Sequence, residues 1–187
     1  MCWRILTDRN DRKFDGITQK HKAIPSVGKY LISMLTTEEK YEIEKAISVV
    51  PIRKSACIEA LKVVQHHRRW ISDESLKDVA AYMEMTPEEL DSVATFYNLL
   101  FRRPVGRHII LVCDSISCWV MGYEQIRNGL IDKLGIKYGE TTPDDRFTLL
   151  PNCCLGTCDT APALMIDKDL YKNVTLDQLD EILKKYQ

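Results

Sequence analysis

The sequence contains no long hydrophobic run. Its longest apolar stretches, such as residues 109–112, are only a few residues long, whereas a membrane-spanning helix needs about 20. Residues 1–6 are followed at once by charged residues, so the apolar core of a secretion signal is missing. Three Asp residues in the same region argue against a mitochondrial presequence. We therefore expect a cytoplasmic protein that does not insert into a membrane.

The chain also lacks an excess of either charge. It has 26 Lys and Arg against 27 Asp and Glu in 187 residues, so nothing in its overall charge attracts nucleic acid. This length, with 45% hydrophobic residues, is sufficient for one or two globular domains with real cores. Residues 1–35 are locally basic and carry no motif that we can assign. We predict that they form a polar N-terminal arm, which lies on a partner or is left loose.

Two motifs common in redox proteins are absent. No Gly-x-Gly-x-x-Gly follows a predicted strand and no phosphate-binding loop of the Walker type occurs, so we do not expect this chain to bind a dinucleotide by itself. No two cysteines are separated by two residues, and neither 112–125 nor 147–167 contains a Lys, Arg or His that would activate a thiol. A thioredoxin-type reactive dithiol is therefore disfavoured.

The first half of the chain after the arm has the pattern of helices. Thr36 and Thr86 each stand three residues before a Glu, which is the spacing of a capping box, and Pro87 suits a first helical turn. Apolar residues recur at helical spacing after each of these caps and in two segments between them. We predict a small helical bundle domain over residues 36–103.

From residue 104 the pattern alternates between strand and helix. Apolar β-rich runs at 109–112 and 147–150 flank a helix with inward residues at 126, 130 and 134. Two short strands, 163–166 and 170–174, then form a hairpin before a final helix that begins at Thr175. This order predicts a thioredoxin-like α/β domain over residues 104–187. For the bond before Pro162 we expect the usual trans form.

Seven cysteines cannot all pair within one chain, and a cytoplasmic protein keeps its thiols reduced. Five of them fall into two short segments, and we predict that both lie in loops after strands. These five are Cys113, Cys118, Cys153, Cys154 and Cys158. Four converging thiolates form a site for soft metals, including iron-sulfur clusters. The spacing does not decide between Cys153 and Cys154, because Cys153 and Cys158 would repeat the four-residue gap of the first pair.

The residues between these cysteines suit a 2Fe-2S cluster. Its negative charge has to be offset by backbone N–H groups, which requires small and conformationally permissive residues such as Ser115, Ser117, Gly156 and Thr157. A structural zinc site would use the same thiolates, although paired zinc cysteines are most often separated by two residues. The leading prediction is therefore a redox cluster, with a structural zinc adaptor as its rival.

Several segments together closely resemble one known family, the E subunit of bacterial NADH:quinone oxidoreductase (respiratory complex I). The resemblance covers roughly residues 36–187 and is carried by residues 56–65, 70–72, 93–97, 104–108, 113–115, 147–151 and 153–159. It implies a helical N-terminal domain followed by a thioredoxin-like ferredoxin domain with one 2Fe-2S cluster. It also implies that Cys113, Cys118, Cys154 and Cys158 are the ligands and that Cys153 is a neighbour. The family often has a glycine where this chain has Arg69, which leaves the geometry of that turn open.

The resemblance further implies the place of the chain in a larger assembly. It would be an electron-transfer subunit of an NADH dehydrogenase module, docked on a partner subunit that binds FMN and NADH and associated with an iron-sulfur subunit. The assembly would lie on the cytoplasmic side of the bacterial inner membrane. The related subunit of a soluble NAD-linked hydrogenase or formate dehydrogenase is the alternative within the same class.

Overall fold

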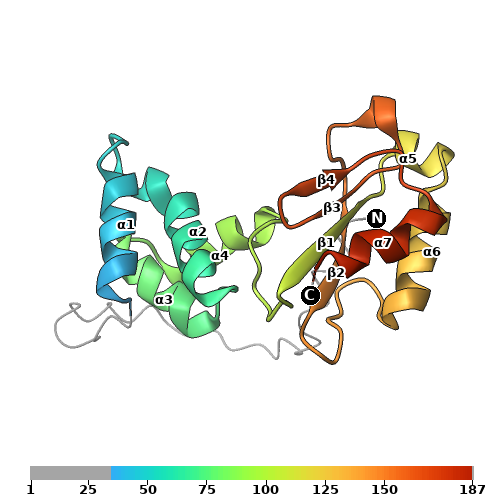
Figure 1. The fold of residues 1–187 in the computed structure, drawn as a ribbon. Coiled ribbons are helices and arrows are strands. Elements are labelled where there is room, and N and C mark those ends of the chain that lie inside the picture. The colour runs from blue at the N-terminus through green and yellow to red at the C-terminus, as the bar shows by residue number, and fades with distance from the viewer. Residues whose placement is uncertain (1–34, 187) are drawn as a thin grey trace, which may run out of the picture.

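The computed structural model describes residues 35–186, so the predicted arm lies almost entirely outside the described residues. Four helices form one half of the molecule, and a sheet with its covering helices forms the other (Figure 1). The helices of the first half are α1 (Thr37–Ile47), α2 (Cys57–Arg68), α3 (Asp73–Tyr82) and α4 (Pro87–Phe96), with a 3-10 turn η2 (Arg53–Ala56) before α2.

Both predicted capping boxes are present. Thr36 accepts a hydrogen bond from the Glu39 N–H at 3.1 Å, and the Glu39 carboxylate accepts one from the Thr36 N–H at 2.8 Å. Thr86 and Glu89 make the same pair of bonds at the start of α4. Each box satisfies backbone donors that the first helical turn leaves without partners.

Helix α2 lies at the centre of the helical half and contacts α1, α3 and α4. Its buried face carries Ala60, Leu61 and Val64, none of which is accessible to solvent. These side chains belong to a core that draws residues from Leu35 to Leu100. The hydrophobic face predicted from the helical spacing is therefore the face that packs.

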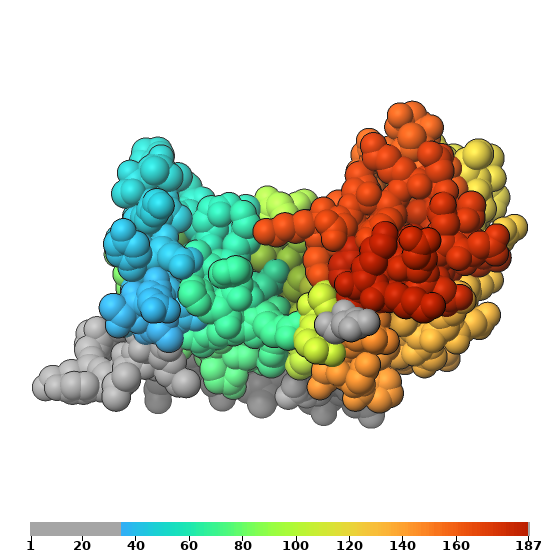
Figure 2. All heavy atoms as spheres, viewed as in Figure 1, coloured from blue at the N-terminus to red at the C-terminus, as the bar shows by residue number. Residues whose placement is uncertain are grey.

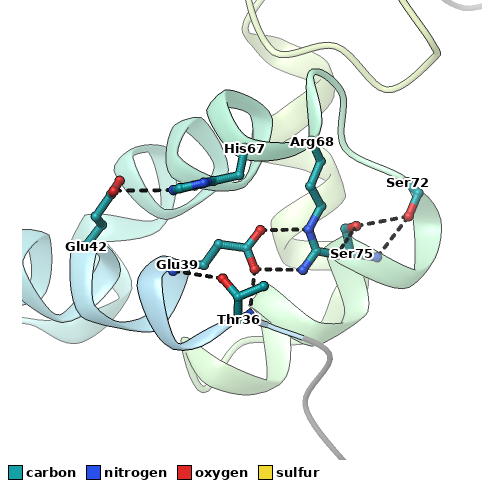
Figure 3. A network of polar contacts seen from close by, with 7 residues as sticks. All are labelled: Thr36, Glu39, Glu42, His67, Arg68, Ser72 and Ser75. Atoms are coloured by element: carbon teal, nitrogen blue, oxygen red, sulfur yellow. Dashed lines mark hydrogen bonds and ion pairs between the residues drawn. The ribbon is translucent and has the colours of Figure 1, made fainter.

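A polar network joins α1, α2 and α3 beside this core (Figure 3). Both oxygens of the Glu39 carboxylate accept hydrogen bonds from the Arg68 guanidinium at 2.7 Å. Arg68 also donates to the Ser75 hydroxyl at 2.9 Å. The Glu39 side chain is only 1% exposed, so its charge depends on these partners.

The chain turns sharply after α2 at Arg69, which adopts a left-handed conformation with φ 71°. A glycine reaches this region without steric cost, whereas a residue with a Cβ adopts it less readily. The Arg69 guanidinium donates to the Gly106 carbonyl at 2.7 Å. Arg69 therefore makes this turn and also contacts the segment that enters the sheet.

The second half is built on a four-stranded mixed sheet with the order β2-β1-β3-β4. The strands are β1 (His108–Cys113), β2 (Phe147–Asn152), β3 (Leu164–Ile166) and β4 (Asp169–Tyr171). β1 and β2 are parallel, with Cys113 opposite Asn152, whereas β3 is antiparallel to both β1 and β4. This is the thioredoxin-like arrangement that the element order predicts.

Helices α6 (Tyr123–Leu134) and α7 (Leu179–Lys184) pack side by side against the sheet, and the short turn η4 (Leu176–Gln178) precedes α7 (Figure 1). Their contact is close at Gly129, where an added Cβ would lie 3.0 Å from Leu179 Cδ1 of α7 and 2.6 Å from Leu176 Cδ2 of η4. Buried residues of α6, α7 and the strands form a second core, separate from that of the helical half. The division into domains at residues 103 and 104 remains a prediction.

The segment between α4 and β1 joins the two halves. Gln65 of α2 holds it from both sides, since its amide donates to the Leu99 carbonyl at 2.9 Å and accepts from the Phe101 N–H at 2.7 Å. Together with Thr148 and Leu150 of β2, this segment lines a cavity of about 350 Å³. The two halves form the walls of a broad notch in the surface (Figure 2).

Some local expectations need correction. Cys118 lies in a short helix, α5 (Ile116–Val120), and Cys158 begins a 3-10 turn, η3 (Cys158–Thr160), so neither lies in an irregular loop. The Ala161–Pro162 bond is cis, and the trans expectation was wrong. No helix within residues 35–186 is long and apolar enough to cross a membrane.

Candidate metal centre

The four predicted ligands come from two places at one edge of the sheet. Cys113 is the last residue of β1, and Cys118 follows it on α5; both are buried. Cys154 lies in the loop after β2 and Cys158 at the start of η3, and both are exposed. Because β1 and β2 are parallel neighbours, their carboxyl ends deliver the two cysteine segments to the same edge.

The four thiols lie close enough to affect one another's pKa values. Burial, together with the neighbouring thiols of Cys113 and Cys158, raises the pKa of Cys118 to about 11. The pKa of Cys154 is lowered, first by a hydrogen bond from the Gly156 N–H and next by the neighbouring thiols of Cys158 and Cys113. The fold brings together the four cysteines that the resemblance implies.

This arrangement fits the donor set of a 2Fe-2S cluster. Such a cluster takes four thiolates, two on each iron. Within residues 35–186 no three His, Cys, Asp or Glu side chains are arranged around a point that could hold a single metal ion. Cys113, Cys118, Cys154 and Cys158 would supply the four thiolates that two irons require.

The loop after β2 supplies donors for sulfur, as its composition predicts. The Gly156 N–H donates to Cys154 Sγ at 3.3 Å. Gly156 has φ 76°, and an added Cβ would meet no atom within 4 Å, so the backbone conformation and not crowding requires the glycine. The Ser115 hydroxyl also lies near Cys154 and contributes to lowering its pKa. Donors to a thiolate offset negative charge at the sulfur.

Cys153 occupies a different position. It is exposed and precedes Cys154 directly. The thiol partners that shift the pKa values of Cys118 and Cys154 are Cys113 and Cys158. The choice of Cys154 over Cys153, which spacing left open, has this geometry in its favour.

The structure has an apolar surface beside the cysteines that was not predicted from the sequence. Ile116, Trp119, Val120 and Met121 are each between 60% and 80% exposed, and they surround the buried Cys118 in the chain. We call these four residues the α5 patch. The signal was present as three large apolar residues directly after a cysteine, but only the structure shows that they face outward. Clustered exposed apolar side chains are typical of binding surfaces.

Comparison with known proteins agrees with this geometry. Residues 43–187 match the family model of the thioredoxin-like [2Fe-2S] ferredoxins. The chain belongs to this family, whose cofactor is a 2Fe-2S cluster.

Within the family the chain is similar to two curated relatives of known name. It is 45% identical to the E subunit of the NADH-quinone oxidoreductase of Buchnera aphidicola subsp. Acyrthosiphon pisum over 153 residues, which are 82% of this chain and 94% of that protein. It is 43% identical to the E subunit of the Escherichia coli strain K12 oxidoreductase, over 82% of this chain and 92% of that protein. The predicted resemblance to this subunit family is confirmed.

A solved structure shares the fold at lower identity. A chain of the NAD⁺-reducing [NiFe]-hydrogenase in the H₂-reduced state superimposes with a TM-score of 0.59 and 24% identity. The match covers 68% of this chain and 22% of that chain. At this identity the likeness concerns the fold alone.

Proposed function

We propose that this chain is the electron-transfer subunit of the NADH dehydrogenase module of respiratory complex I, and that Cys113, Cys118, Cys154 and Cys158 hold its 2Fe-2S cluster. The observation that carries the proposal is the convergence of these four cysteines at one edge of the sheet, in a chain 43–45% identical to two E subunits over 82% of its length. When bound, the cluster accepts and returns one electron at a time. Hydride transfer from NADH would occur at FMN on a partner subunit.

The chain's own residues have two tasks in this function. Buried Cys113 and Cys118 anchor one side of the centre in the core, away from water. Gly156 directs a hydrogen-bond donor at Cys154, with Ser115 nearby, and so offsets the negative charge that reduction adds. Exposed Cys154 and Cys158 leave the other side of the centre accessible to a partner. This combination of a buried and an exposed side suits electron exchange across an interface.

The α5 patch supports docking on the FMN-binding subunit. Its four apolar side chains adjoin the centre, and their burial in an interface would exclude water from the place where electrons cross. A second contact, with the iron-sulfur subunit of the same module, follows from membership of the module. The chain would then be peripheral on the cytoplasmic side of the bacterial inner membrane.

The alternative is the corresponding subunit of a soluble NAD-linked hydrogenase or formate dehydrogenase. The fold is shared with an NAD⁺-reducing hydrogenase at 24% identity, whereas relatives from NADH-quinone oxidoreductase reach 45%. The higher identity over more of the chain favours the respiratory complex. Activity of the purified native complex separates the two, as membrane-bound quinone reduction or as soluble turnover of hydrogen or formate.

Metal analysis of the full chain tests the centre. We expect two irons and two sulfides per chain and a visible absorption that bleaches with dithionite. Cys154→Ser should lose or grossly alter this absorption, and Cys153→Ser, the matched control one residue away, should keep it. A colourless wild-type protein with one zinc and no iron would overturn the cluster in favour of the zinc adaptor. Loss in Cys153→Ser alone would overturn the ligand choice.

Binding to the purified FMN-binding subunit tests the docking surface. Trp119→Ala should weaken binding about 30-fold, which corresponds to a hot-spot loss of about 2 kcal/mol. Tyr41→Ala serves as the control, because Tyr41 is 73% exposed but lies on α1, in the other half of the molecule. If the two variants bind the FMN-binding subunit with equal affinity, the α5 patch is not part of the interface.

A further inference from the structure

A chain of two hydrogen bonds connects the helical half to the loop of Cys154. Asn98 Nδ2, in the segment after α4, donates to Asn152 Oδ1 at 2.5 Å. Asn152 Nδ2 in turn donates to the Cys154 carbonyl at 2.9 Å. A carbonyl can only accept, so the amide NH₂ of Asn152 must face Cys154, and its oxygen is left for Asn98. The two bonds therefore determine each other's direction.

Asn152 is also tied to the other cysteine segment. It is the last residue of β2 and lies opposite Cys113 in the sheet register. Its carbonyl accepts a hydrogen bond from the Asp114 N–H at 3.0 Å. Only 7% of Asn152 is exposed, so the loss of a partner would leave a buried polar group unsatisfied. One residue thus connects both cysteine segments and the helical half.

Asn98 has firm support on the helical side. Its neighbour Leu99 accepts a hydrogen bond from the Gln65 amide, and Phe101 donates to the same amide. Gln65 belongs to α2, the central helix of that half. The position of Asn98 therefore follows the position of the helical bundle.

We infer that Asn152 is a positioning residue for the centre and that Asn98 is its anchor, so that the helical half tunes the redox behaviour of the Cys154 loop. The inference rests on the proposed ligand role of Cys154. The Asn152 bond holds the Cys154–Leu155 peptide, and the next peptide carries the Gly156 N–H that donates to Cys154 Sγ. Release of that peptide weakens the N–H to sulfur bond. Reduction adds negative charge at the sulfurs, so a weaker donor disfavours the reduced state.

The test uses the full chain with its cluster and four variants: Asn98→Ala, Asn152→Ala, the double variant, and Asn128→Ala as control. Asn128 lies on α6, outside the chain of bonds. The readouts are iron content, the paramagnetic resonance spectrum of the reduced protein, and the fraction reduced at a fixed solution potential. A tenfold change in the ratio of reduced to oxidised cluster corresponds to 59 mV for one electron.

We expect Asn98→Ala to remain folded with two irons per chain, but to lower the ratio of reduced to oxidised cluster severalfold. Asn152→Ala should lower it at least as much, and the double variant should match Asn152→Ala, because the anchor acts only through Asn152. Asn128→Ala should behave as wild type.

Asn98→Ala with the wild-type ratio and spectrum would overturn the inference, and so would additive effects in the double variant. Asn98 is exposed and lies outside the Cys154 loop. Asn98→Ala therefore tests the inference even if Asn152→Ala does not retain iron. Failure of the proposed function would appear differently, as a wild-type protein without a 2Fe-2S signal.

Discussion

Removal of the Arg68 guanidinium tests how the helical half is held together. In Arg68→Ala, the Glu39 carboxylate loses both hydrogen bonds to Arg68 and keeps only its capping contacts with Thr36 (Figure 3). The Glu39 side chain is 1% exposed, so water cannot replace the lost partner without movement of α1 or α2. An unpaired buried charge is therefore the dominant consequence of this substitution.

Loss of one member of a fully buried pair costs about 3–5 kcal/mol. The Arg68 side chain is 26% exposed, so the pair lies at the edge of the core, and the lower end of this range applies. We expect Arg68→Ala to lower the free energy of unfolding by about 3 kcal/mol at pH 7. The matched control is Lys62→Ala on the same helix, where the Lys62–Glu59 pair is exposed on both sides and contributes about 0–1 kcal/mol.

The effect should depend on pH. Burial raises the pKa of Glu39, but hydrogen bonds from Arg68 and Thr36 outweigh burial, so the net pKa lies below its ordinary value of 4.5. A carboxylate with a lowered pKa contributes stability above its ordinary pKa, and this stability is lost as the pH falls through the folded pKa. The difference between wild type and Arg68→Ala should therefore be largest near pH 7 and shrink below pH 4.5.

Urea unfolding followed by far-ultraviolet circular dichroism at pH 7 and pH 4 measures both effects. A loss in Arg68→Ala no larger than in Lys62→Ala would refute the reasoning that the buried charge dominates. An equal loss at the two pH values would refute the assignment of the effect to charge and favour lost packing of the Arg68 stem.

Other substitutions test the packing of each half. Gly129→Ala should change the free energy of unfolding by no more than about 1 kcal/mol, because the new Cβ would meet Cδ2 of the partly exposed Leu176, which can move away, and alanine favours the helix by about 1 kcal/mol; a loss of about 3 kcal/mol would contradict this reasoning. Thr86→Ala should cost about 1 kcal/mol in urea unfolding through loss of the capping box, and a neutral result would show that the cap is dispensable. Leu61→Ala, at a position with no exposed surface, should cost about 2–5 kcal/mol in the helical half. If the predicted domains at 36–103 and 104–187 unfold separately, Leu61→Ala lowers the helical transition and leaves the bleaching of the visible absorption unchanged; a shift of both transitions would argue for one cooperative unit.

Local features of the fold could be predicted from the sequence because their partners are close along the chain. The capping boxes at Thr36 and Thr86 span three residues each and occur as predicted. Strand β1 was expected at 109–112 and occupies His108–Cys113. Helix α5 was missed because the few residues between two cysteines are too short to display a period. The cis form of the Ala161–Pro162 bond was missed for a related reason, since the dipeptide by itself favours trans.

For the candidate centre too, some features could be predicted from the sequence and others required the structure. The residue types and spacing of the cysteines, and the segments around them that carry the family resemblance, are properties of the sequence alone. Whether Cys154 or Cys153 belongs to the centre was left open by spacing, and the position of Cys154 beside Cys113 and Cys158 favours Cys154. The outward face of the α5 patch also required the structure, because exposure depends on what the rest of the chain covers.

The sequence by itself determined the chemistry available to this protein: four thiolates for a soft metal centre, permissive residues around them, and no motif for a dinucleotide. The tertiary structure decided which groups meet. Glu39 accepts a hydrogen bond from Arg68, which lies 29 residues further along the chain. Asn98 donates one to Asn152, at a separation of 54 residues. Such contacts leave no periodic trace in the sequence, because they depend on how separate segments pack together and not on the conformation of either segment alone.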